Sequence, residues 1–292
     1  MENLKENLLE LIRKTSAELP ADVMRALESG QQKEMQGSPS QHAMDNIQKN
    51  IQLALEKSKP LCHDTGSILF YVEAPRGFDQ LVFEQEAKKA VIVATKKGYL
   101  RQNSVDSITG QISENNTGPG NPSFHFHQNT RKDFTVRLLL KGGACENVGA
   151  QYSLPCEALK ADRDLEGVKK CILNAVSQAQ GKGCSPGVLG VTIGGDRSTA
   201  YAGSKEQFLR PITDVNLNPT LARLEEEIVK EANKLGIGPM GFGGETTLLA
   251  CKISALNRVP ASFFVTISYM CWAFRRQGFV LSMEGEIKKW LY

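Results

Sequence analysis

The stretch Cys184-Ser-Pro-Gly-Val-Leu-Gly-Val-Thr-Ile-Gly-Gly195 indicates how the chain folds. A cysteine in a turn with proline and glycine is followed by the apolar run 188–193, which two glycines end. A short apolar run between turn residues predicts a buried strand. The preceding residues, 164–180, carry valine and isoleucine at helical spacing. The stretch therefore predicts a helix, a cysteine turn and a strand that ends in glycines.

Similar units occur on both sides of this stretch. The strand expected at 133–140 runs into Lys141-Gly-Gly-Ala-Cys-Glu-Asn147. A helix at 218–235 precedes the glycine-dense residues 236–247, which we expect to lead into a short helix through Leu249. A final strand is expected at 262–268. These units predict an α/β fold, with mixed or parallel sheets, glycine-rich turns at one end and surrounding helices.

The N-terminal part of the chain is expected to be helical. Apolar residues at helical spacing predict helices at 2–17, from about residue 22, and at about 43–57. Neither an internal repeat nor a low-complexity linker divides the sequence. We therefore predict a single domain over residues 1–292, with residues 1–58 as a helical section within it.

Composition excludes several classes of protein. The apolar fraction of 41% and the charged fraction of 23% are ordinary for a globular protein. A net charge of +3, without a basic block, argues against a nucleic-acid partner. No apolar run approaches the roughly 18 residues that span a bilayer, and the N-terminus does not resemble a secretory signal. We expect a cytoplasmic protein with no membrane association.

Seven cysteines are present, and three of them lie in turns. Cys62 is followed by Asp-Thr-Gly, Cys184 lies between glycines and proline, and Cys271 ends an apolar run and precedes two arginines. Thiolates suit iron–sulfur clusters, and three of them on a four-iron cluster leave one iron open to substrate. We interpret the others as buried free thiols: Cys145, Cys156, Cys171 and Cys251.

Two further motifs allow more than one interpretation. Phe124-His-Phe-His127 alternates aromatic and histidine residues, which favours a strand over a zinc site because no third ligand is evident. The glycines after the strand at 133–140 could bind a carboxylate through backbone N–H groups or could form only a tight turn.

Five stretches in this order resemble the iron–sulfur-dependent class I fumarase and L-tartrate dehydratase family, in its alpha subunit or N-terminal domain. The resemblance covers about residues 19–282. Its motifs are Cys62-His-Asp-Thr-Gly, Leu100-Arg-Gln-Asn-Ser-Val, Lys141-Gly-Gly-Ala-Cys-Glu-Asn, Cys184-Ser-Pro-Gly-Val-Leu-Gly-Val-Thr-Ile-Gly-Gly, and Pro260-Ala-Ser-Phe-Phe-Val-Thr-Ile-Ser-Tyr-Met-Cys-Trp-Ala-Phe-Arg-Arg.

The resemblance implies a [4Fe–4S] cluster bound by Cys62, Cys184 and Cys271. In such hydro-lyases the unligated iron acts as a Lewis acid on the substrate's hydroxyl and carboxylate oxygens, with no net redox change. The family also has a second, swivelling domain. Because nothing after Ser282 could encode it, we expect a separate beta subunit, with dimerisation through the alpha chains.

Matching positions imply the remaining site residues. Asp64 matches an active-site aspartate, and His63 stands beside it where the family usually has glutamine. Arg101 matches an arginine that binds a substrate carboxylate. Gly142 and Gly143 match a glycine turn that contacts the substrate through backbone N–H groups. We assign catalysis to Asp64 and His63, and substrate binding to the other three.

The leading hypothesis is a hydro-lyase that reversibly dehydrates a 2-hydroxy-dicarboxylate, with malate to fumarate preferred. Tartrate dehydration to oxaloacetate is the alternative, because His63 and the apolar Val259, where some fumarases carry a histidine, make the substrate uncertain. An iron–sulfur electron-transfer or redox-sensing protein is the alternative from another class. That alternative would need a fourth cysteine ligand, for which Cys145 and Cys251 are candidates.

Overall fold

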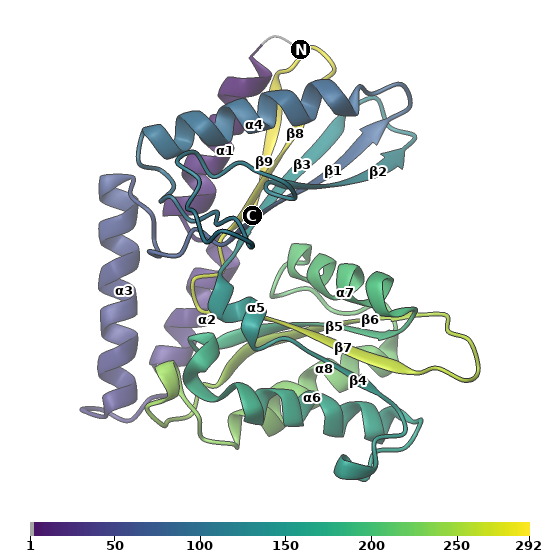
Figure 1. Ribbon diagram of the computed structural model, residues 1–292. Coiled ribbons are helices and arrows are strands. Elements are labelled where there is room, and N and C mark those ends of the chain that lie inside the picture. The colour runs from purple at the N-terminus through teal and green to yellow at the C-terminus, as the bar shows by residue number, and fades with distance from the viewer. Residues whose placement is uncertain (1–2) are drawn as a thin grey trace. The chain divides into compact units, whose positions relative to one another are not determined.

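The computed structural model describes residues 3–292, and these divide into two compact units (Figure 1). Unit 1 comprises Met1–Ala21, Gln48–Gly143 and Ala273–Tyr292. Unit 2 comprises Asp22–Ile47 and Ala144–Trp272. Each unit is assembled from separate chain segments. That residues 1–292 form a single domain stays a prediction.

Unit 1 contains a mixed five-stranded sheet in the order β2-β1-β3-β8-β9. Its strands are β1 (Ser67–Pro75), β2 (Ser123–Asn129), β3 (Phe134–Lys141), β8 (Arg276–Leu281) and β9 (Ile287–Leu291). Strands β1 and β2 are parallel, and the other pairs are antiparallel. Helices α1 (Leu4–Ala17) and α4 (Gln80–Lys96) cover one face of this sheet (Figure 1).

The alternating direction of side chains along the strands explains why helices cover one face of this sheet. Phe134, Val136, Leu138 and Leu140 of β3 are buried in the same apolar cluster as the inner residues of α1 and α4. Successive strand residues point to opposite faces, so these four share one face. Each buried side chain of this size contributes roughly 1.5–3 kcal/mol relative to exposure. The predicted strand at 133–140 is confirmed, as is the one around His125.

Unit 2 contains a four-stranded sheet in the order β4-β7-β5-β6. Its strands are β4 (Ala150–Ser153), β5 (Gly187–Gly194), β6 (Leu248–Leu256) and β7 (Phe264–Met270). Helices α6 (Leu165–Ala179) and α8 (Pro219–Asn233) cover one face, and α7 (Arg197–Glu206) lies on the other (Figure 1). The remaining elements are α2 (Ala21–Gln31), α3 (Pro39–Lys57), α5 (Gly143–Asn147), and the short helices at Glu157–Leu159, Gln180–Gly183, Gln207–Leu209 and Pro239–Gly241.

The strand of the cysteine stretch, β5, is buried along its whole length. Leu189 and Val191 pack in the cluster that includes α6 and α8. On the opposite face, a Cβ atom at Gly190 would collide with the carbonyl of Ser204 in α7. The absence of a side chain at Gly190 therefore allows α7 to lie directly on the sheet.

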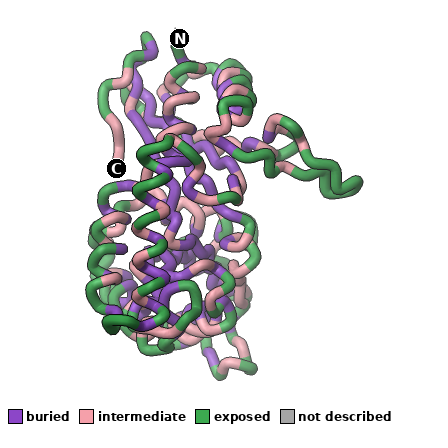
Figure 2. The backbone as a smooth tube through the Cα atoms, turned by 90° about the vertical axis from the view of Figure 1, so that its left-hand side faces the viewer, coloured by how far each residue is buried: buried purple, intermediate pink, exposed green. Residues whose placement is uncertain are grey.

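The predicted fold class is confirmed, since mixed sheets are surrounded by helices and the N-terminal helices are present. The expected short helix through Leu249 is wrong, because β6 begins at Leu248 and pairs in parallel with β5. A short apolar run can form either element, and here pairing with β5 provides its backbone hydrogen bonds. Buried residues predominate in β1, β3, β5, β6, β7 and β8, whereas β2, β4 and β9 are only partly buried (Figure 2). Among residues 3–292, no helix is long and apolar enough to cross a membrane.

Candidate active site

The site residues expected from the sequence are divided between the two units. Unit 1 contains Cys62, His63, Asp64, Arg101, Gly142 and Gly143, and unit 2 contains Cys184 and Cys271. The contacts within each unit are described separately.

Asp64 in unit 1 accepts three hydrogen bonds through its two carboxylate oxygens. Oδ1 accepts from the backbone N–H of Gly66 at 2.9 Å and from Asn103 Nδ2 at 2.7 Å. Oδ2 accepts from the backbone N–H of Gly143 at 2.6 Å. These donors come from three separate chain segments. The half-buried carboxylate is therefore held at the point where its own turn, the loop after α4 and the end of β3 meet.

The segment that carries Arg101 is tied to the same turn. The buried Thr65 hydroxyl donates to the Arg101 carbonyl at 2.8 Å and accepts from the Arg101 N–H at 3.0 Å. Asn116, 1% exposed, also donates to the Arg101 carbonyl, at 2.7 Å. Its side-chain oxygen accepts from the N–H of Asn103 at 2.7 Å. The backbone of residues 101–103 is fixed by these contacts, while the Arg101 residue as a whole is exposed.

The turn that contains Cys62 is anchored on both sides. Leu61 donates its N–H to the Ser16 carbonyl at 2.9 Å and accepts from Asn50 at the same distance. After the turn, Gly66 has φ +75, and a Cβ atom there would collide with the carbonyl of Lys141. Only glycine adopts this conformation at so close an approach without strain. Between the two anchors Cys62 and Asp64 are half-buried and His63 is exposed.

The glycine turn at the end of β3 lies against Asp64. Gly142 is buried, and a Cβ atom on it would lie 3.2 Å from Asp64 Oδ2. The Gly143 N–H donates to the same Asp64 oxygen at 2.6 Å. The one-turn helix α5 starts at this residue. The turn is tight, and the Gly143 N–H binds the carboxylate of Asp64 within the chain. That the turn binds a carboxylate of a ligand stays a prediction.

In unit 2 a backbone hydrogen bond joins the segments of the other two cysteines. The N–H of Trp272, next to Cys271, donates to the Cys184 carbonyl at 3.3 Å. Cys184 adopts the left-handed conformation, with φ 56, and its N–H donates to the Gly181 carbonyl at 3.0 Å. Left-handed backbone is uncommon for a cysteine and is maintained here by the surrounding turn. Cys184 is half-buried, and Cys271 is 7% exposed.

Tyr269 lies between these cysteine segments. Its side chain is buried, and Cβ atoms at Gly183 or Gly187 would collide with its ring. Burial raises the pKa of the Tyr269 hydroxyl, and nearby thiols, first that of Cys271 and also that of Cys184, raise it further. The ring therefore packs against the turn that carries Cys184, and Gly183 and Gly187 leave the space that it occupies.

Most of the remaining cysteines are core residues, as expected. Cys145, Cys171 and Cys251 are buried, whereas Cys156 is only half-buried, so its prediction as a buried thiol is wrong. Burial raises the pKa of the Cys171 thiol to about 11, and it also raises the pKa of Cys251. These two thiols stay protonated near neutral pH and are poor metal ligands in that form.

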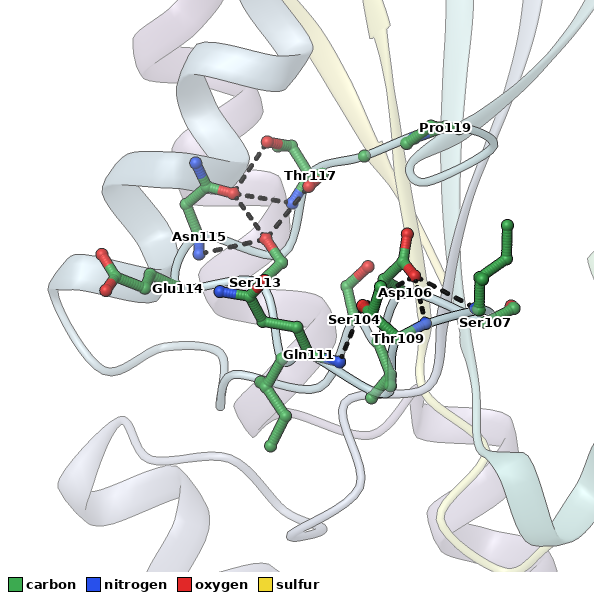
Figure 3. Close-up of a pocket in the computed structure, with 14 residues that line it drawn as sticks. Ser104, Asp106, Ser107, Thr109, Gln111, Ser113, Glu114, Asn115, Thr117 and Pro119 are labelled. Atoms are coloured by element: carbon green, nitrogen blue, oxygen red, sulfur yellow. Dashed lines mark hydrogen bonds between the residues drawn. The ribbon is translucent and has the colours of Figure 1, made fainter.

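A hollow of about 830 Å³ lies within the long loop of unit 1 (Figure 3). Residues of the segment 104–119 line it, and none of the expected site residues is among them. Its polar groups bond to one another: Asp106, for example, accepts from the N–H groups of Ile108 and Thr109. The residues that line this hollow do not include Asp64 or its hydrogen-bond donors.

Within residues 3–292, no three histidine, cysteine or acidic side chains converge as the ligands of a single metal ion. In a four-iron cluster each thiolate binds a different iron, so such convergence is not required of Cys62, Cys184 and Cys271. All three lie in turns or directly after a strand. This donor set fits an iron–sulfur cluster.

Comparison with known proteins now identifies the family. The family model for fumarate hydratase (Fumerase) matches residues 5–280. This chain belongs to the fumarate hydratase family. The match covers both units, and the family predicted from the five motifs is confirmed.

Relatives within the fumarate hydratase family carry two different names. A protein assigned as a class I fumarate hydratase in Geobacillus stearothermophilus is 52% identical over 296 residues, which is all of this chain and 58% of that protein. A protein assigned as an L(+)-tartrate dehydratase subunit alpha in Methanocaldococcus jannaschii is 32% identical, over 94% of this chain and 95% of its own length. The L(+)-tartrate dehydratase subunit alpha of Escherichia coli K12 is 32% identical, over 89% of this chain and 85% of its own length. This chain therefore spans little more than half of the first relative and most of the other two.

Two residues that the sequence did not single out lie beside Asp64. Asn103 donates to Asp64 Oδ1, and Arg275 approaches Gly142, where a built Cβ atom would lie 3.8 Å from Arg275 Nη2. Both fall inside recognised motifs, Asn103 two residues after Arg101 and Arg275 in the arginine pair after Cys271. A motif places such residues in one family but does not show which of them face the aspartate.

Proposed function

We propose that this chain is the alpha subunit of a [4Fe–4S]-dependent hydro-lyase that reversibly dehydrates a 2-hydroxy-dicarboxylate, with malate to fumarate preferred. The family match supports the reaction class. The observation that carries the proposal is the arrangement around Asp64, which directly follows the Cys62 turn. A carboxylate held by three N–H donors beside a glycine turn is a fixed acceptor at which a substrate proton can be received.

Cys62, Cys184 and Cys271 would bind the cluster through their thiolates. When bound, the cluster supplies a Lewis acid for the substrate's hydroxyl and carboxylate oxygens. The hydrogen bond between the segments of Cys184 and Cys271 supports their pairing as ligands. The buried ring of Tyr269 packs against Gly183 and Gly187, on either side of Cys184.

The other site residues bind and orient the substrate. Asp64 would accept or return the proton on the carbon next to the hydroxyl-bearing carbon, and exposed His63 would assist this transfer. Arg101 would bind one substrate carboxylate, because its backbone is fixed while the residue remains exposed. Gly142 and Gly143 would let the substrate approach the backbone closely.

The proposed partners follow from the relatives. Two of them are named as alpha subunits. A relative of which this chain covers only 58% has room for a further domain. We infer that a separate beta subunit completes the enzyme, that alpha chains dimerise, and that the enzyme works in the cytoplasm.

Tartrate is the alternative substrate, and the tartrate dehydratase names of two relatives favour it. The higher identity to the Geobacillus relative favours fumarate and malate. Parallel assays decide between them: fumarate hydration and L(+)-tartrate dehydration by the same reconstituted preparation. A higher kcat/KM for tartrate would reverse the preference that we propose.

The test of the function is anaerobic reconstitution of the chain with iron and sulfide, with and without its beta-subunit candidate. We expect about four irons per chain, a cluster absorption spectrum, and fumarate hydration only when the partner is present. Serine at Cys62, Cys184 or Cys271 should abolish iron loading, while Cys171→Ser, a buried thiol in α6, is the matched control that should load normally.

Two results would overturn the proposal. Unchanged iron content in all three ligand variants would remove the assigned ligand set. A full cluster that cycles between redox states but never hydrates a substrate would favour the electron-transfer alternative. Cys145 tests the electron-transfer alternative further, since it is buried and its Sγ lies 4.0 Å from the carbonyl of Gly183, the residue before Cys184. Loss of iron in Cys145→Ser would support four-cysteine ligation.

A further inference from the structure

Arg275 is a buried cation without a hydrogen-bond partner for most of its guanidinium. The residue is 1% exposed, and Nε and Nη1 have no partner among the described residues 3–292. Its carbonyl accepts from the Leu140 N–H at 3.0 Å, which fixes its backbone to the end of β3. Arg275 therefore lies in unit 1, beside the glycine turn that follows this strand.

A guanidinium in this environment requires an anion. Arginine cannot lose its proton in a protein, so the free-energy cost of burying its charge cannot be avoided by neutralisation. Buried polar groups are nearly always paired, and an unpaired buried charge is strongly unfavourable. Arg210 shows the usual solution, because it pairs with Asp214 and Glu225. Among residues 3–292, Arg275 has no such ion pair, and its Nε and Nη1 have no hydrogen-bond partner.

The Nη2 end of the Arg275 side chain lies near Gly142 and Asp64. A Cβ atom on Gly142 would lie 3.8 Å from Arg275 Nη2 and 3.2 Å from Asp64 Oδ2. A donor and an acceptor thus both lie close to Gly142, where a larger residue would crowd them. Asp64 is already bonded to Gly143 and Asn103 and forms no ion pair with Arg275 in the described structure.

We propose that Arg275 binds a carboxylate of the dicarboxylate substrate, beside Gly142 and next to Asp64. This inference rests on the proposed hydro-lyase function and adds a residue to its substrate site. The charge of a guanidinium is delocalised, so an anion at Nη2 offsets the charge of the whole group. With Arg101 assigned to the other carboxylate, unit 1 provides one arginine for each end of the substrate. Because Arg101 and Arg275 would each bind one carboxylate, a ligand needs two carboxylates to bind tightly.

The test measures binding of succinate, an unreactive dicarboxylate, to the reconstituted complex of the chain with its beta subunit, by calorimetry and by thermal shift. In Arg275→Met, which keeps length but removes charge, we expect succinate affinity to fall about 10- to 100-fold. Melting temperature without ligand should stay equal or rise, because an unpaired buried charge has been removed. Arg275→Lys should bind succinate with intermediate affinity, since it keeps the charge but loses the planar fork.

Two further measurements complete the experiment: the preference for a dicarboxylate over a monocarboxylate, and a control variant at another arginine. The ratio of succinate affinity to butyrate affinity should fall in Arg275→Met, because one of two carboxylate partners is gone. Arg131→Gln is the control: this exposed arginine of unit 1 pairs with Glu73 and should bind succinate like the parent. Iron content is measured in every variant, so that loss of the cluster is not mistaken for loss of binding.

The outcomes separate the two proposals. A parent complex of the chain with its beta subunit that loads iron but binds no dicarboxylate would overturn both the hydro-lyase assignment and the substrate role of Arg275. A parent that binds succinate, with Arg275→Met binding it equally, would overturn only the role of Arg275. A lower melting temperature in ligand-free Arg275→Met, with succinate affinity retained in Arg275→Lys and Arg275→Met, would show that the guanidinium stabilises the fold.

Discussion

The side chain of Asn116 should control both the stability of unit 1 and the position of the donors near Asp64. Its Oδ1 accepts from the N–H groups of Asn103 at 2.7 Å and Ser104 at 3.2 Å. Its Nδ2 donates to the Arg101 carbonyl at 2.7 Å and to Thr95 Oγ1 at 3.0 Å. Asn116→Ala removes all four bonds at a buried position.

The expected cost of this substitution follows from what each partner retains. The Arg101 carbonyl keeps Thr65, and the Thr95 hydroxyl keeps the Val91 carbonyl. The two N–H groups lose their acceptor, which costs about 1 kcal/mol each. Asn116 also has φ +59, a conformation that costs alanine about 1 kcal/mol more. Unfolding should therefore require about 3 kcal/mol less free energy, a fall in melting temperature of roughly 6–12 °C.

The assay combines thermal unfolding with fumarate hydration by the complete complex. Because Asn103 donates to Asp64, its displacement should lower kcat/KM by roughly 10- to 100-fold at a temperature where the variant is folded. Asn115→Ala is the control. The Asn115 side chain accepts only from Ser113 and Thr117 within the loop (Figure 3), so kcat/KM should be unchanged. Equal losses in both variants, or an unaffected Asn116→Ala, would refute the reasoning.

Two further predictions concern the cysteine segments. Gly187→Ala should destabilise the chain by about 1–3 kcal/mol and reduce iron loading, because its Cβ would collide with the ring of Tyr269. Gly118→Ala, with nothing within 4 Å of the added atom, should melt like the parent, and equal melting of the two variants would contradict this prediction. In iron-free protein at pH 8, iodoacetamide should label half-buried Cys62 faster than Cys171, whose thiol pKa of about 11 keeps it protonated. Mass spectrometry of the labelled peptides checks this order, and preferential labelling of Cys171 would contradict it.

Much of the secondary structure could be predicted from local patterns. The strands that contain Val191 and Val136 are short apolar runs between turn residues, and the helix after Asn218 begins with proline. These signals lie within a few residues of each other, so tertiary contacts are not needed to recognise them. The strand at Leu248 was predicted as a helix because its apolar run is compatible with both elements. Its pairing with β5, more than fifty residues away, determines which one forms.

The candidate site shows the same division between what local sequence predicts and what tertiary contacts determine. The sequence alone identified the family, the turns that carry Cys62, Cys184 and Cys271, and Asp64, since each is part of a contiguous motif. Only the tertiary structure brought Asn103 and Gly143 to Asp64, across sequence separations of 39 and 79 residues. Only the structure showed that Arg275 is buried without a bonded partner for Nε and Nη1. Burial and hydrogen bonding depend on what surrounds a side chain in space, and for these residues the surroundings come from distant parts of the chain.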